Sequence, residues 1–239
     1  MTDTFVAVDI ETTGLNPKSD KIIEIGAVKV AGGRTIETFD TLVNPKCRLR
    51  EFIIELTGIT DAMLQKAPEE EEAFQKFLAF AREEVLLGHH LIFDYSFLKS
   101  IAVKQKISFE RKGIDTLKIA RICLPQIEKH SLEYLCTYYQ IVNLHAHRAC
   151  EDVMATIALY QKLGEEFFDG SLQMKKVFSA EQMAYQVKKD SPITAAQMRY
   201  LKALVQYHRI GLEEEIEQMT KQAASRKIDQ ILSVYGKIR

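Results

Sequence analysis

The sequence predicts an α/β domain, with a mixed β-sheet flanked by helices, and a small C-terminal helical module. Three observations lead to this prediction. Three β-rich runs open the chain, segments with helical periodicity then alternate with at least one further apolar strand, and a separate helical pattern begins after Pro192. We expect residues 1–170 to form the α/β domain, 171–191 a linker with some helical content, and 192–239 the helical module.

The first predicted strand, residues 5–11, carries two carboxylates in an otherwise apolar run. Side chains alternate along a strand, so Val6 and Val8 face one way, and Asp9 and Glu11 face the other. Two carboxylates on one face repel each other unless cations lie beside them. Their oxygen atoms suit hard divalent cations such as Mg²⁺ or Mn²⁺. Taken alone, the pair is also typical of an edge strand whose polar residues face solvent.

The elements that follow justify the rest of the α/β prediction. Two further β-rich runs, 21–30 and 35–45, flank Gly32 and Gly33, a spacing that predicts a hairpin and thus three antiparallel strands. Helical spacing of apolar residues begins at Glu69. The remaining expected elements are a buried strand within residues 85–94 and helices within 95–105, 117–125, 131–141 and 151–168.

The C-terminal module shows clear helix boundaries. Thr194 followed by Gln197 is a capping-box pattern that predicts a helix start. We expect this helix to run to about Ile210 and to stop at Gly211, and Thr220 to cap a second helix. A surface for nucleic acid or a partner protein and a cap that only stabilises the chain are both consistent with such a module.

Composition indicates an ordinary globular protein. The chain has 239 residues, 46% of them hydrophobic, and a formal net charge of −1, which argues neither for nor against a nucleic-acid partner. Residues 1–170 are acidic and those from 171 onward are basic. The four cysteines lack zinc-ligand spacing, no apolar run approaches the roughly 18 residues of a membrane span, and the N-terminus lacks a signal-peptide pattern. We therefore expect a cytoplasmic protein without a membrane partner.

Two more acidic positions join the first pair. Asp94 ends the apolar run in "GHHLIFDYSFL" and precedes a helical pattern, which on its own is typical of a helix N-cap. His147 lies five residues before Asp152, so the two cannot share one helical face. We expect His147 on the loop that approaches the helix and Asp152 on the helix itself. Seen singly, a surface histidine and a helix-start acid need have no catalytic role.

In this order, the three patterns resemble the three exonuclease motifs of the DEDD superfamily, in its histidine-containing branch. The sequence is most similar to the proofreading epsilon subunits of bacterial DNA polymerase III and their stand-alone relatives. The connecting segments "LVNP", "ELTGITDAMLQKAP", "IDTLKIAR" and "HSLEYL" also resemble that family, and the resemblance covers roughly residues 4–168.

The resemblance implies a ribonuclease-H-like exonuclease fold and a two-metal mechanism. It assigns two divalent cations, Mg²⁺ with Mn²⁺ as the alternative, to a set of four carboxylates: Asp9, Glu11, Asp94 and Asp152. His147 is then the general base. The reaction implied is hydrolysis of phosphodiester bonds at 3′ ends, with release of nucleoside 5′-monophosphates.

The resemblance also implies contacts to substrate. The positions concerned are Thr12, Gly14, Leu15 and Phe93, of which the first three match residues that hold or wedge the terminal nucleotide. Two positions depart from the family pattern, because Thr57 stands where the family usually shows histidine and His90 where it usually shows asparagine. Both lie near the substrate in relatives, so these departures bear on substrate choice and leave the metal chemistry unaffected.

Three functions follow as hypotheses. The first is a 3′–5′ exonuclease on DNA, single strands preferred; the second is an exoribonuclease that trims RNA 3′ ends, since the same site can cut both. The third is a nucleic-acid-binding module without catalysis, against which the full set of acidic residues and His147 argues. A proofreading role would require a separate DNA polymerase as partner.

Overall fold

The computed structural model describes residues 1–143, 146–187, 191–212 and 215–238. It divides the chain into two compact units, Met1–Val187 and Lys188–Arg239. None of the helices in these described ranges is both long and apolar enough to cross a membrane.

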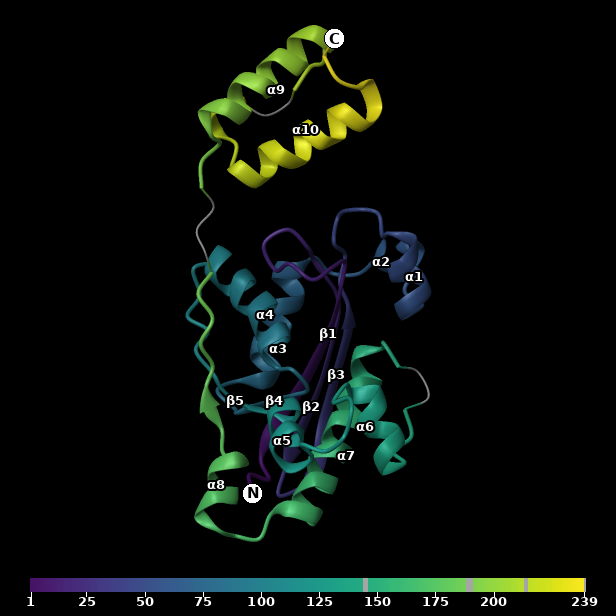
Figure 1. The fold of residues 1–239 in the computed structure, drawn as a ribbon, viewed down its shortest axis with the longest axis vertical. Helices are drawn as coiled ribbons and strands as arrows, with labels where there is room; N and C mark the ends of the chain where they lie inside the picture. Colours follow the sequence, from purple (N-terminus) through teal and green to yellow (C-terminus); the bar gives the residue numbers. More distant parts are fainter. Residues whose placement is uncertain (144–145, 188–190, 213–214, 239) are drawn as a thin grey trace. The chain divides into compact units, whose positions relative to one another are not determined.

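The first unit is built on a six-stranded mixed sheet with strand order β3-β2-β1-β4-β5-β6 (Figure 1). The strands are β1 (Phe5–Thr12), β2 (Ile22–Ala31), β3 (Arg34–Leu42), β4 (Leu86–Gly88), β5 (Lys112–Asp115) and β6 (Glu181–Gln182). Strands β1, β2 and β3 are antiparallel, β4 lies parallel to β1, β5 parallel to β4, and β6 antiparallel to β5. The predicted opening hairpin and the mixed sheet are confirmed, and β1 lies in the interior of the sheet.

Helices cover both faces of this sheet (Figure 1). They are α1 (Glu51–Thr57), α2 (Asp61–Leu64), α3 (Glu70–Ala81), α4 (Ile92–Lys104), α5 (Thr116–Cys123), α6 (Leu132–Tyr139), α7 (Ala149–Phe167) and α8 (Leu172–Val177). Val6 and Val8 pack in one core cluster with residues of α3 and α4, whereas Phe5 and Ala7 pack in another with residues of α7. The predicted alternation along β1 is therefore confirmed.

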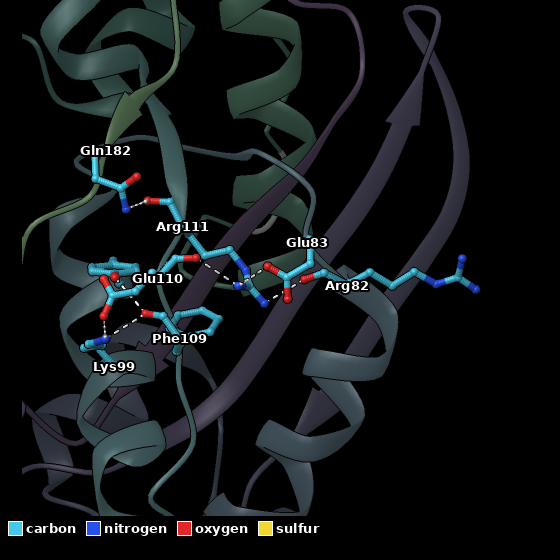
Figure 2. Close-up of polar contacts among 8 residues, drawn as sticks. Arg82, Glu83, Lys99, Phe109, Glu110, Arg111 and Gln182 are labelled. Carbon is cyan, nitrogen blue, oxygen red and sulfur yellow. Dashed lines mark hydrogen bonds and ion pairs between the residues drawn. The ribbon is translucent and has the colours of Figure 1, made fainter.

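The segment expected to be a linker, residues 171–191, differs from that expectation. It forms α8 and then β6, and the ring of Phe178 is buried 5.9 Å from that of Tyr160 on α7. The backbone N–H of Met183 donates to the carbonyl of Arg111 at 2.8 Å. Figure 2 shows the Gln182 side-chain amide donating to the same carbonyl, at 3.0 Å. Apolar burial and strand pairing thus extend the first unit to Val187.

Asp94 also differs from the expected helix N-cap. Leu91 occupies the N-cap of α4 and makes no side-chain capping hydrogen bond, while Asp94 is the third residue of the helix. Its side chain is thus free to form a hydrogen bond elsewhere in the fold.

The second unit contains α9 (Ala195–His208), the 3₁₀ helix η1 (Ile216–Gln218) and α10 (Lys221–Tyr235). The capping box of Thr194 and Gln197 is confirmed, as is the cap of α10 by Thr220. The first helix ends before the predicted stop at Gly211, because Arg209 takes a left-handed conformation with φ of 54°. A small core holds the helices together, formed by Ile193, Leu201, Leu204, Met219, Ala224 and Ile231.

Candidate active site

The structure brings the acidic residues and the histidine of the three motifs into one cavity. Asp9 and Glu11 come from β1, Asp94 from the first turn of α4, and Asp152 from the first turn of α7. His147 lies on the loop that enters α7, as predicted. All five line a cavity of about 260 Å³. Residues far apart in the chain thus converge beside the interior strand β1.

Asp94 is fixed by a hydrogen bond to β1. Its Oδ1 accepts the backbone N–H of Ile10 at 3.1 Å, and the residue is only 2% exposed. Ile10 lies between Asp9 and Glu11, so this bond ties the first turn of α4 to the centre of the acidic pair. The side chain that could have capped the helix instead joins two elements of the site.

Asp152 is fixed by the loop that precedes α7. Its Oδ2 accepts the backbone N–H of His147 at 3.0 Å, and its Oδ1 accepts the side-chain amide of Asn143 at 2.7 Å. A ring nitrogen of His147 and one carboxylate oxygen each of Glu11 and Asp152 lie within 4.8 Å of one another. Sequence reasoning missed Asn143, because an asparagine in a loop carries no motif signal.

The carboxylates perturb one another strongly. Burial, followed by the nearby charges of Asp94 and Glu11, raises the pKa of Asp9 well above its usual value. Burial also raises the pKa of Asp94, despite the hydrogen bond from Ile10 that lowers it. Burial and the charges of Asp152 and Glu24 raise the pKa of Glu11 to about 8. Without a metal, the carboxylates of the cluster therefore cannot all be ionised at neutral pH.

This donor set fits divalent cations. Carboxylate oxygens that repel one another in a buried cavity gain from a cation placed among them, and hard oxygen ligands are what Mg²⁺ and Mn²⁺ prefer. One carboxylate oxygen of Glu11 and one of Asp152 lie within 4.8 Å of each other, close enough to share one ion. The chemistry of the residues thus agrees with the divalent-metal dependence that the exonuclease resemblance implies.

Of the residues expected to contact substrate, His90 and Phe93 line the cavity. Their rings stack with centroids 6.5 Å apart and planes at 24°. Thr12, Gly14 and Leu15 do not belong to this lining. They lie on β1 and the turn after it, where the Thr12 hydroxyl donates to the Gly14 carbonyl at 2.6 Å and Leu15 is 84% exposed.

Thr57 lies outside the cavity lining as well. It is buried at the end of α1, where its hydroxyl donates to the carbonyl of Ile53 at 2.8 Å. Its role in the structure is to close the last turn of that helix, followed by Gly58 in the left-handed conformation.

His89 and the start of α6 complete the lining, and sequence reasoning did not single them out. One ring nitrogen of His89 lies 2.9 Å from the Thr116 hydroxyl and the other 2.8 Å from the carbonyl of His130. Burial lowers the pKa of His89. The imidazole thereby joins α5 to the segment that begins α6 at Ser131.

A family model described as "Exonuclease" matches residues 6–160. The chain belongs to the exonuclease family. The resemblance read from the three motifs is thus confirmed, and with it the DEDD superfamily. This exonuclease domain is also similar to the DNA polymerase III PolC-type of Caldanaerobacter subterraneus subsp. tengcongensis. The two are 43% identical over 162 residues, which cover 68% of this chain and 12% of that much longer protein.

Solved structures show the same fold. Exonuclease X in complex with 5′ overhanging duplex DNA is 25% identical, with a TM-score of 0.57, and the match covers 73% of this chain and 99% of that one. The zinc-bound complex of E. coli ExoI with single-stranded DNA is 23% identical, with a TM-score of 0.63 over 71% of this chain and 42% of that one. The expected ribonuclease-H-like exonuclease fold is therefore confirmed.

Proposed function

We propose that this chain is a metal-dependent 3′–5′ exonuclease that hydrolyses phosphodiester bonds at 3′ ends of DNA, single strands preferred, and releases nucleoside 5′-monophosphates. The observation that carries the proposal is the convergence of four carboxylates and His147 in one cavity. Membership of the exonuclease family supports the reaction type. The DNA-bound neighbours and the DNA polymerase III relative support DNA as substrate.

In this proposal the carboxylates hold two divalent cations, with Mg²⁺ as the physiological ion. The ligands would be Asp9, Glu11, Asp94 and Asp152. Bound cations supply Lewis-acid stabilisation of the charge that develops on the phosphate oxygens. The protein contributes rigidity, because Asp94 is tied to the backbone of Ile10 and Asp152 to the backbone of His147.

His147 would take the proton from the attacking water. Its side chain is exposed and its ring reaches the edge of the carboxylate cluster. Imidazole is the side chain that most often serves as a general base in enzymes. The backbone N–H of His147 is held by Asp152, which keeps the imidazole at the mouth of the cavity.

The stacked rings of His90 and Phe93 offer a wall for a base of the substrate. Stacking against aromatic rings is the sequence-tolerant mode by which proteins bind single strands. Thr12, Gly14 and Leu15 would contact the terminal nucleotide from the turn after β1, where the exposed Leu15 side chain can wedge against a base. A DNA polymerase is the partner that we propose for a proofreading role, by analogy with the polymerase relative.

The test is a gel assay on 5′-labelled single-stranded DNA and RNA of identical sequence, with Mg²⁺ or EDTA. We expect a metal-dependent ladder that shortens from the 3′ end, faster on DNA. Asp9→Ala should abolish it, whereas Asp3→Ala, which removes an exposed carboxylate of the same N-terminal segment, should not. Faster shortening of RNA would make the chain an exoribonuclease. No shortening of either strand would favour a binding module.

A further inference from the structure

An ion pair between a buried carboxylate and a partly exposed arginine lies beside the proposed site and outside its ligand set. Glu24 on β2 is paired directly with Glu11 on β1 in the antiparallel register, and its side chain is only 1% exposed. Arg148, the residue between His147 and α7, meets it from 124 positions away in the chain. The inference drawn from this pair rests on the proposed exonuclease function.

The contacts between the two side chains are extensive. The Nε of Arg148 donates to Oε1 and Oε2 of Glu24 at 3.0 and 3.2 Å, and its Nη2 donates to Oε1 at 2.6 Å. The same carboxylate accepts the backbone N–H of Ala149, the first residue of α7, at 2.9 Å. Arg148 is the N-cap of α7 and makes no side-chain capping bond, so Glu24 caps this helix from the sheet.

The start of α7 lies directly against β2. A Cβ atom added to Gly26 would stand 2.5 Å from the backbone of Ala149 and Cys150, so only glycine permits this approach. Glu24 lies two residues before Gly26 on the same strand and therefore on the same face of the sheet. The carboxylate and the glycine together seat the first turn of α7, which carries Asp152.

The negative charge of Glu24 also requires a cation at this position. A buried carboxylate opposite Glu11 would repel the acidic cluster unless a cation faced it. The guanidinium of Arg148 supplies that cation in a forked geometry that fixes its direction as well. His147, the preceding residue, has a left-handed φ of 66°, a conformation that a non-glycine residue keeps only where its neighbours are held in place.

We infer that Glu24 and Arg148 are positioning residues of the exonuclease. Their ion pair clamps residues 147–149 to β2 and thereby sets both the imidazole of His147 and the carboxylate of Asp152. Neither residue is assigned a contact with substrate. The pair acts on the rate of hydrolysis through the two residues that it holds.

The experiment compares Arg148→Met with the double variant Glu24→Gln/Arg148→Met. The single variant leaves a buried carboxylate without its cation and should lose stability. The double variant removes that charge, and the introduced glutamine keeps an oxygen for the N–H of Ala149, so the melting temperature should return close to that of the wild type. Both variants lack the ion pair that clamps residues 147–149 to β2.

A matched control is the pair of Lys21 and Glu70. Glu70 is 6% exposed, Lys21 is 36% exposed, and the carboxylate likewise accepts a backbone N–H, that of Ile22, at 3.1 Å. Neither residue lines the cavity. Lys21→Met and Glu70→Gln/Lys21→Met therefore reproduce the loss and the recovery of stability without touching the segment that carries His147.

We expect kcat on single-stranded DNA at saturating Mg²⁺ to fall about tenfold or more in the double variant, with KM within about twofold and the melting temperature restored. The control variants should keep kcat within about twofold. Hydrogen exchange provides a readout besides activity. The amide of His147 should exchange at least about tenfold faster in the double variant than in the wild type, whereas the amide of Ala149 keeps its acceptor at position 24.

Recovery of kcat together with the melting temperature would overturn the inference, since the pair would then be merely structural. Unchanged exchange at the amide of His147 would overturn it as well. If the wild type releases no nucleotide, the proposed function fails, and the exchange rates alone decide whether the pair clamps the segment.

Discussion

Replacing Glu11 with glutamine should change how the stability of the metal-free protein depends on pH. Burial, Asp152 and Glu24 raise the pKa of Glu11 from 4.5 to about 8, and Arg148 opposes them. A carboxyl whose pKa is raised in the folded state favours folding at low pH, where it is protonated in both states. This advantage disappears as the pH rises through 8. The sign is opposite to that of a carboxylate in an ordinary salt bridge.

The magnitude follows from the shift. The pKa of Glu11 rises from 4.5 to about 8, a difference of about 3.5, and each pKa unit corresponds to about 1.4 kcal/mol. The free energy of unfolding therefore falls by at most about 5 kcal/mol as the pH rises over this range. Between pH 5 and pH 8 the loss amounts to up to about 4 kcal/mol. For a unit of this size, 1 kcal/mol shifts the melting temperature by about 2–4 °C. The expected shift is therefore about 10 °C.

The assay is thermal unfolding in EDTA at pH 5, 6, 7 and 8. We expect the melting temperature of the wild type to fall by about 10 °C relative to Glu11→Gln as the pH rises. Glu37→Gln, which changes an exposed carboxylate on β3, should follow the wild type. Added Mg²⁺ should stabilise the wild type most at pH 8, since metal and protons compete for the same oxygens. Parallel curves for the wild type and Glu11→Gln would refute the reasoning.

His147→Ala should cut the hydrolysis rate about 100-fold or more and leave Mg²⁺ affinity within about threefold, whereas Asp9→Ala should lose both; equal losses of affinity in calorimetric titrations would contradict these roles. Gly26→Ala should cost about 1–3 kcal/mol of stability and lower kcat, because its Cβ would meet the backbone of α7 at 2.5 Å; an unchanged melting temperature would contradict this. Removing residues from 188 onward should weaken binding of long single strands more than of dinucleotides if the module contacts nucleic acid, and equal binding would make it a stabilising cap.

Much of the fold could be predicted because its signals are local. Alternation along residues 5–11 placed Asp9 and Glu11 on one face, and the glycine pair at 32–33 placed the first hairpin. The loop before α7 was predicted from the five-residue spacing of His147 and Asp152. In each case a short period or a turn residue carries the information, and no distant partner is needed.

The rest depends on contacts between distant segments. Strand β6 has two residues and gains its place from the carbonyl of Arg111, so no periodicity marks it. Phe178 lies in a segment of mixed composition, and its burial against α7 helps to show that the first unit continues there. Glu24 lies in a strand that is apolar apart from Glu24 itself and Lys29, and its partner is 124 residues away. A single sequence contains both residues, but it gives no signal that the two are in contact.

The site concentrates acidic groups at a cost in stability that its own chain only partly offsets. Arg148 faces Glu24 and opposes the rise in the pKa of Glu11, while burial and neighbouring charges raise the pKa values of Asp9 and Asp94. Carboxylates that bind a divalent cation must be deprotonated. Their attraction to the bound cation then offsets the electrostatic repulsion that raises their pKa values in the metal-free site. Loading the site should therefore stiffen β1, α4 and the start of α7 together, because hydrogen bonds tie α4 to β1 and the start of α7 to the neighbouring strand β2. A chelator would then act on this protein twice, removing the proposed Lewis acid and loosening the segment that carries His147.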